Sequence, residues 1–153
     1  MLFVFVVWYN ATMNLVLLAV VTSVFFGAYN FFIKISSGHI NQIVGAVILQ
    51  VVAAVLGGIV FMVLKATNAP IEVSQKGVTF AILAGIMVGL AEIASFFVFS
   101  KGLSASVGTP IIIGGAVVVG SLLGLIFLKE NLTSVHYLAI ALIVVGVILL
   151  STK

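Results

Sequence analysis

The sequence contains no cysteine, no arginine and no aspartate, and it carries little charge of either sign. Without cysteine, disulfide bridges, thiolate metal sites and thiol catalysis are excluded. Charged residues make up 6% of the 153 positions, against roughly a quarter in a typical soluble domain, whereas apolar residues make up 64%. A chain with so little polar surface has lipid as its solvent, and its composition therefore indicates an integral membrane protein.

The few charges and polar motifs give no support for catalysis. The net charge of +3 comes from six scattered lysines and three glutamates, so the basic character predicts no nucleic-acid partner. The sequence has no phosphate-binding glycine loop, no Ser/His/Asp set and no zinc-binding His/Glu helix. We therefore expect no enzymatic activity, no catalytic residue, no cofactor and no metal site.

Five long apolar runs predict an all-α membrane protein with five transmembrane helices. Each run is close to the roughly 17–25 residues that a helix needs to cross the hydrocarbon core, where the backbone has to satisfy its own hydrogen bonds. We expect Thr133 or Ser134 to cap the last helix, and Pro110 lies in the first turns of the fourth. The predicted spans are residues 12–33, 42–64, 77–99, 105–128 and 134–150, joined by short polar loops.

Residues 1–12 form an apolar N-terminal extension, and residues 13–151 form a single five-helix domain. The extension is too short to span a membrane alone, and it lacks the positive start of a signal peptide, so we expect no cleavage. It either extends the first helix or lies at the interface, where Trp8 and Tyr9 are favoured. A third interpretation places the functional start at Met13.

The lysines are divided evenly between the two sides of the predicted membrane protein. Orientation is normally set by an excess of Lys and Arg in cytoplasmic loops, and this chain has no such excess. Two interpretations stay open: an even split by chance, or insertion in both orientations with pairing to an inverted copy. The side of the N-terminus has Lys65, Lys76 and Lys129, and the opposite side has Lys34, Lys101 and Lys153.

Several motifs together resemble the EamA-type repeat of the drug/metabolite transporter superfamily. They are FSKGLSASVGTP at 99–110, FLKENLT at 127–133, GVILL at 146–150 and, near the start, FFGAYN at 25–30 with Lys34. The resemblance covers about residues 13–150. Larger members are similar to two five-helix halves in one chain, the second inverted because five is odd. The resemblance therefore implies an antiparallel homodimer of ten helices with its site near the midplane.

Glu92 is the acidic residue that lies inside a predicted span, about 15 residues into the third helix. A carboxylate in hydrocarbon is costly and normally faces a cavity or a partner. We predict that Glu92 lines the transport pathway and couples it to protons. The alternative is a protonated glutamate that bonds a neighbouring helix. This prediction comes from the position of the carboxylate and not from the resemblance.

Polar residues on other helices complete the candidate pathway. On the first helix, Ser23, Gly27, Asn30 and Lys34 lie within about 60° of one another. Asn30 either orients a solute or bonds another helix, and Lys34 is expected to extend toward the headgroups. The remaining candidates are Tyr29, Gln50, Phe96, Thr109 and Pro110. Tyr29 and Phe96 also have a packing interpretation, and Gln50 has an interhelical bond as its alternative. Thr109 and Pro110 are expected to loosen the fourth helix near the site, as broken helices do in transporters.

These features predict a secondary transporter of small organic solutes in the cell membrane. It would work by alternating access, with proton coupling through Glu92 as one version. Its partners would be the lipid bilayer, the solute and an inverted copy of the chain. Two other classes stay open: a dual-topology channel and a non-transporting subunit of a larger membrane complex. Neither the substrate nor the direction of transport is predicted.

Overall fold

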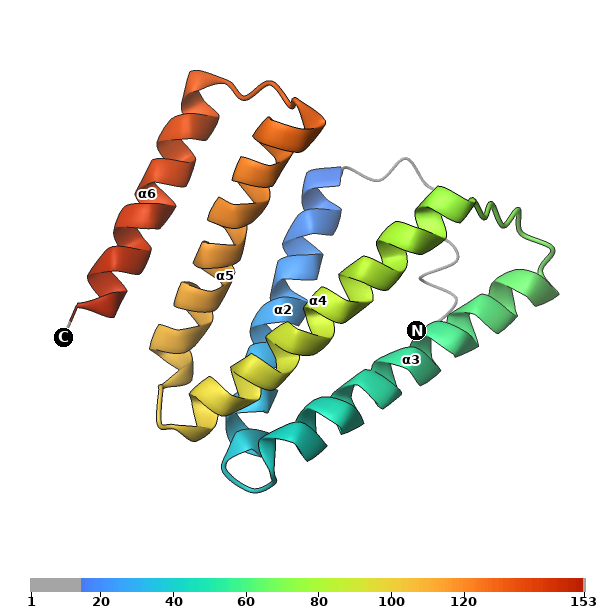
Figure 1. Ribbon diagram of the computed structural model, residues 1–153, viewed down its shortest axis with the longest axis horizontal. Coiled ribbons are helices and arrows are strands. Elements are labelled where there is room, and N and C mark those ends of the chain that lie inside the picture. Colours follow the sequence, from blue (N-terminus) through green and yellow to red (C-terminus); the bar gives the residue numbers. More distant parts are fainter. Residues whose placement is uncertain (1–14, 153) are drawn as a thin grey trace. The chain divides into compact units, whose positions relative to one another are not determined.

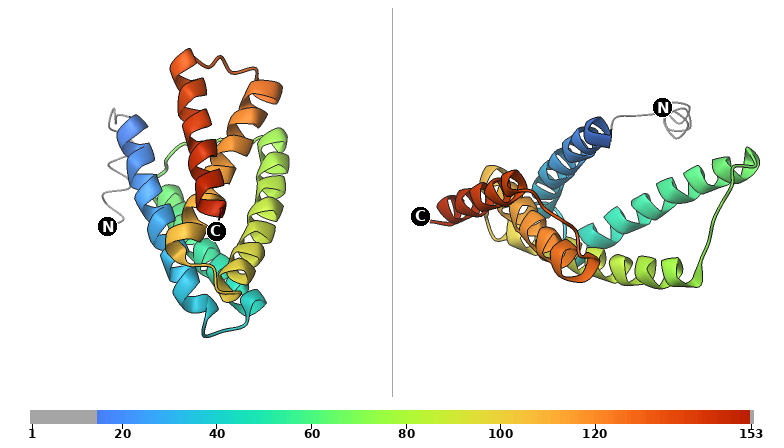
Figure 2. Two further views of the ribbon diagram at one scale, coloured as in Figure 1. Left: turned by 90° about the vertical axis from the view of Figure 1, so that its left-hand side faces the viewer. Right: turned by 90° about the horizontal axis from the view of Figure 1, so that it is seen from above.

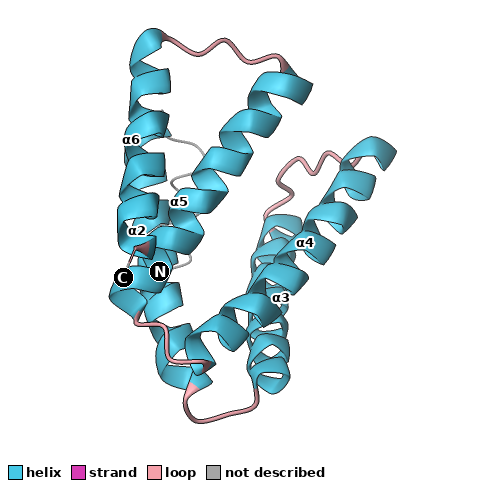
Figure 3. Cartoon of the chain, turned by 60° about the vertical axis from the view of Figure 1, so that its left-hand side comes forward, coloured by secondary structure: helices cyan, strands magenta, loops and turns pink. Residues whose placement is uncertain are grey.

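The computed structural model describes residues 15–152, and this part of the chain is helical without any strand (Figures 1 and 3). The predictions for residues 1–12, for a start at Met13 and for the position of Lys153 lie outside the described residues. The helices are α2 (Leu15–Ser37), α3 (Gln42–Ala66), α4 (Gln75–Ser100), α5 (Ala105–Leu123), continued by the π-helical turn η1 (Gly124–Leu128), and α6 (Ser134–Ser151).

The structure confirms five helices that are long and apolar enough to cross a membrane in the described part of the chain. Most boundaries agree with the predicted spans, but the first predicted loop began too early. Helix α2 continues past Lys34 to Ser37. The Ser37 hydroxyl group donates a 2.9 Å hydrogen bond to the Lys34 carbonyl. The backbone N–H of Gly38 then bonds the Ile35 carbonyl at 3.3 Å. Local capping, which hydropathy does not report, therefore fixes the end of this helix.

Side chains and backbone conformation define the other helix ends. Asn41 begins α3 by accepting hydrogen bonds from the backbone N–H groups of Ile43 and Val44. The predicted cap at Thr133 is confirmed, because Thr133 and His136 form a reciprocal capping box at the start of α6. Pro110 lies inside α5, which continues through it.

Within the described residues, those from Leu15 to Ser100 form one compact unit built from α2, α3 and α4. Helix α3 runs antiparallel to its two neighbours, so α2 and α4 are parallel. Their buried residues gather where α2 ends, α3 begins and α4 ends, which is the end where α3 and α4 converge (Figures 1 and 2). The buried set is Asn30, Ile33, Ser37, Gly45, Ala46, Glu92, Ser95, Phe96 and Phe99.

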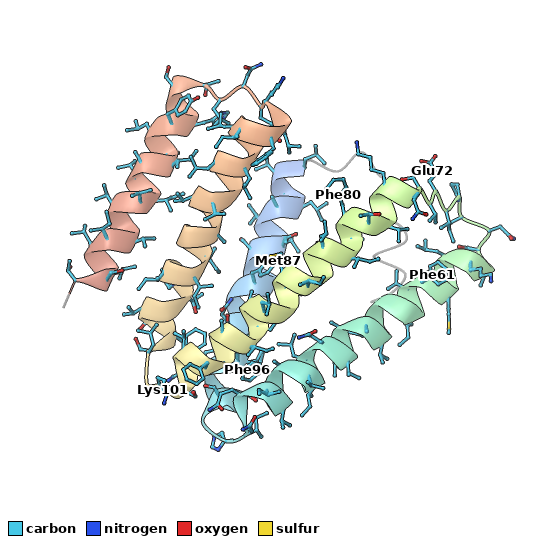
Figure 4. The ribbon with its side chains drawn as sticks, viewed as in Figure 1. Phe61, Glu72, Phe80, Met87, Phe96 and Lys101 are labelled. Atoms are coloured by element: carbon cyan, nitrogen blue, oxygen red, sulfur yellow. The ribbon has the colours of Figure 1, made fainter. Side chains whose placement is uncertain are left out.

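Close approach of α3 and α4 depends on Gly45. A Cβ atom added there would meet the Phe96 ring, lying 2.8 Å from both Cδ1 and Cζ. Phe96 is itself buried, with 2% of its surface exposed, and Figure 4 shows it at the convergent end of α4. The ring therefore has little room to move away from a larger residue.

We expect Gly45→Ala to destabilise the protein by about 1–2 kcal/mol, because the added methyl group overpacks this contact. The matched control is Gly57→Ala on the same helix, where an added Cβ meets nothing within 4 Å. Thermal unfolding of the purified proteins in detergent gives the comparison. Equal unfolding midpoints for the two variants would contradict the proposed packing role.

Residues from Lys101 onward form a second compact unit, the antiparallel hairpin of α5, η1 and α6. Glycine permits close contacts here as well. A Cβ at Gly114 would lie 2.5 Å from Cγ2 of Val147, and one at Gly124 would lie 2.6 Å from Oε2 of Glu130. The chain leaves η1 through Lys129, which has a left-handed backbone with φ 55°.

Candidate functional site

The candidate site lies in the first unit and is centred on Glu92 of α4. Residues at intervals of three and four fall on one face of a helix, so Glu92, Ser95, Phe96 and Phe99 share a buried face. Only 6% of the Glu92 surface is exposed. The sequence therefore buries a carboxyl group among helices that are otherwise apolar.

The Tyr29 phenol of α2 lies close enough to the Glu92 carboxyl group to interact with it electrostatically. Its ring also packs edge-to-face on Phe26 of the same helix, with the centroids 6.1 Å apart. The packing interpretation and the site interpretation of Tyr29 thus apply together. The aromatic contact orients the ring, and the hydroxyl group holds one side of the carboxyl group.

Lys34 has a partner on the neighbouring helix. Its Nζ atom donates a 2.9 Å hydrogen bond to the backbone carbonyl of Phe99, near the end of α4. The last carbonyls of a helix have no partner within the helix, and a cation is favoured there by the helix dipole. Lys34 therefore fastens the end of α2 to the end of α4.

Asn30 lies on α2 beside Tyr29 and is 2% exposed. Its Nδ2 donates a 2.9 Å hydrogen bond to the Phe26 carbonyl one turn earlier. Its Oδ1, like Oε2 of Glu92, is buried without a hydrogen-bond partner among the described residues. Because buried polar atoms are nearly always paired in proteins, these two oxygens, one on α2 and one on α4, are unusual.

Gln50 reaches the same helix from α3. Its amide group packs over Gly89, where an added Cβ would lie 3.5 Å from Oε1 and 3.7 Å from Nε2 of Gln50. Gly89 is three residues before Glu92, so the Gln50 amide lies about one turn from the carboxyl group. Tyr29 of α2 and Gln50 of α3 thus approach α4 close to Glu92, and the buried Asn30 follows Tyr29 on α2.

The remaining candidates are placed differently. Phe96 packs on Gly45 in the core of the first unit. Thr109 is half-buried and Pro110 is exposed, and both belong to α5 of the second unit. Sequence reasoning missed Ser95, which is 8% exposed and lies three residues after Glu92. Its signal was available, because a serine at that spacing shares the face of the carboxyl group.

Five apolar helices, with a carboxyl group buried between three of them, define a multi-pass membrane protein. The chain belongs to the EamA-like transporter family, whose pattern matches residues 13–152. This match confirms the resemblance seen in the motifs. The chain is also similar to an uncharacterized protein of Methanocaldococcus jannaschii, with 33% identity over 137 residues, which cover 89% of this chain and 95% of the relative. No solved structure matches the chain.

Proposed function

We propose that this protein is a secondary transporter that moves small organic solutes across the cell membrane by alternating access. The observation that carries the proposal is the buried carboxyl group of Glu92, held on one side by Tyr29 and unpaired at Oε2. An ionisable group at membrane depth marks a solute or proton pathway by default. Membership of the EamA-like transporter family also supports a transport function.

The proposed coupling follows from the cost of charging a carboxyl group away from water. In a closed, dry site Glu92 is neutral, since a buried charge without a counter-ion costs several kcal/mol. When the site opens to water on one side, the proton leaves and a solute takes its place. Competition between a proton and a solute for one carboxyl group is then sufficient for exchange. Tyr29 keeps the carboxyl group in one orientation throughout.

The working unit in this proposal is an antiparallel pair of chains. An odd number of spans and an even distribution of lysines support insertion in both orientations. The pathway would lie between the inverted copies near the midplane. In this arrangement Asn30 and Gln50 contact the solute and Phe96 forms an apolar wall, while Thr109 and Pro110 allow α5 to deform.

Reconstitution into liposomes tests the function. A solute found by thermal-shift screening of the purified protein should accumulate in vesicles with an acidic lumen, because protons leave as the solute enters. Uptake should saturate with solute concentration, and a protonophore should abolish accumulation. Flux that neither saturates nor responds to the pH gradient would instead indicate a channel. No flux, combined with co-purification of a fixed second protein, would indicate a non-transporting subunit.

A further inference from the structure

Two unpaired oxygens, one on α2 and one on α4, indicate what kind of solute the site takes. They are Oδ1 of Asn30 and Oε2 of Glu92, and both are buried without a partner among the described residues. Burying a polar atom without a hydrogen bond opposes folding. A site that keeps two such atoms on neighbouring helices is therefore suited to a ligand that pairs with both.

Both oxygens accept hydrogen bonds. The orientation of the Asn30 amide is fixed, because only its NH₂ group can donate to the Phe26 carbonyl, which leaves Oδ1 as the free atom. The Tyr29 hydroxyl group interacts with the Glu92 carboxyl group. A charged carboxylate has no proton to donate, so Oε2 is also an acceptor.

The helix register places these two residues at similar levels of α2 and α4. Helices α2 and α4 are parallel, and Tyr29 meets Glu92 while Lys34 meets Phe99. With a rise of about 1.5 Å per residue, the first contact puts Asn30 about one residue from the level of Glu92 and the second puts it about three residues away, so the two backbones lie roughly 1.5–4.5 Å apart along the helix axes. One small group bound between these helices can therefore be shared by the two residues.

We propose that the ligand is an organic cation with at least two N–H donors, such as a primary or secondary ammonium ion. Its charge compensates the Glu92 carboxylate, and its N–H groups pair with the two free oxygens through charge-assisted hydrogen bonds. A quaternary ammonium ion has the same charge and no N–H, so it leaves both acceptors unpaired. The inference rests on the proposed function, since it names the solute class of the same site.

The charged surroundings of Glu92 are compatible with a cation. Helices α2, α3 and α4 carry four other titratable side chains in their described parts: Tyr29, Lys34, Lys65 and Lys76. Lys65 and Lys76 lie at the opposite end of the unit, in the last turn of α3 and the first turn of α4. The Lys34 ammonium group is held by the Phe99 carbonyl. A proton on Glu92 is then the natural competitor of the ammonium ligand.

Three isomeric cations test the proposal on the purified, unmodified protein. They are n-butylammonium, diethylammonium and tetramethylammonium, which share one formula and differ in having three, two and no N–H donors. Binding is measured in detergent, where the absence of a closed compartment avoids diffusion of the free amines across a bilayer. We expect the first two to bind at least about tenfold more tightly than tetramethylammonium, since each charge-assisted hydrogen bond is worth a large factor.

Difference infrared spectroscopy identifies the group that responds. Binding of n-butylammonium should remove the band of a protonated carboxylic acid, and Glu92→Gln should lack both this change and the binding. Asn30→Leu should weaken n-butylammonium binding at least about tenfold and reduce its preference over tetramethylammonium by a similar factor. Thr22→Val is the matched control, because it removes an exposed hydroxyl group that only bonds the Leu18 carbonyl of its own helix.

Equal affinities for the three isomers would overturn the inference, and so would binding of none of them. Both outcomes are measured on the unmodified protein, so the folding of a variant does not affect them. If another solute is transported while the amines do not bind, the inference fails and the proposed function stands. If the amines bind as expected but no gradient drives their uptake, the transporter proposal fails and the binding site stands.

Discussion

Glu92→Gln is expected to abolish solute accumulation driven by a pH gradient while leaving the protein folded. Glutamine has nearly the same size and keeps a carbonyl oxygen that can accept from the Tyr29 phenol, but it cannot exchange a proton. Only the titration is removed, so uptake against a concentration gradient should fall to the level of empty liposomes. Downhill exchange of a neutral solute is expected to survive. The measurement is uptake by proteoliposomes with an imposed pH gradient, made side by side for both proteins.

The matched control is Glu72→Gln. Glu72 is exposed in the loop between α3 and α4, at the end of α4 far from the candidate site (Figure 4). Its replacement removes the same charge from the chain, and gradient-driven uptake should be retained. A Glu92→Gln protein that still accumulates solute would assign the carboxyl group to helix packing. In that case unfolding of the variant should show a loss of stability with no loss of coupling.

The overall fold was predictable because it depends on the length and apolarity of each segment. A run of about 20 apolar residues in lipid has helix as its stable form, so the five spans could be located without knowledge of tertiary contacts. The end of α2 was missed because it depends on two local hydrogen bonds near Gly38. Hydropathy, from which the span was predicted, does not report such hydrogen bonds.

The candidate site was predictable only in part. The cost of burying a carboxylate singled out Glu92, and helical spacing placed Asn30 and Lys34 on one face. The pairing of Tyr29 with Glu92 depends on the register of α2 against α4, which no single sequence specifies. The carbonyl partner of Lys34 on α4 depends on the same packing of the two helices.

The structure also gives a reason for an asparagine at position 30. A leucine at this position would suit an apolar interface, and a buried asparagine costs stability unless its polar atoms are paired. Its NH₂ group is paired within α2, but its oxygen is not. Stability therefore does not explain Asn30, whereas a bound solute would.

Reporters fused after Lys153 are expected to signal from both sides of the membrane, because the lysines give no orientation an advantage. With five spans, successive loops lie on alternate sides of the membrane, and each side receives three lysines. Turning the whole chain over therefore leaves the number of lysines on each side unchanged. The measurement pairs one reporter that is active only in the cytoplasm with one that is active only outside. The two fusions should have comparable activity at equal expression.

Added lysines should break this balance and reveal the inverted pair. Ser100→Lys with Ser104→Lys adds charge to the loop after α4, and Glu72→Lys with Val73→Lys adds charge to the loop on the opposite side. Each double variant should insert mainly in one orientation, because two added lysines in a short loop give one side of the membrane more lysines than the other. Transport should then fall strongly when either variant is expressed alone, since neither finds an inverted partner. Co-expression of the two should restore transport.

Two outcomes would rule out the inverted homodimer: a single fixed location of the unmodified C-terminus, or full transport by one biased variant alone. Either would place the pathway within a single chain or a parallel pair.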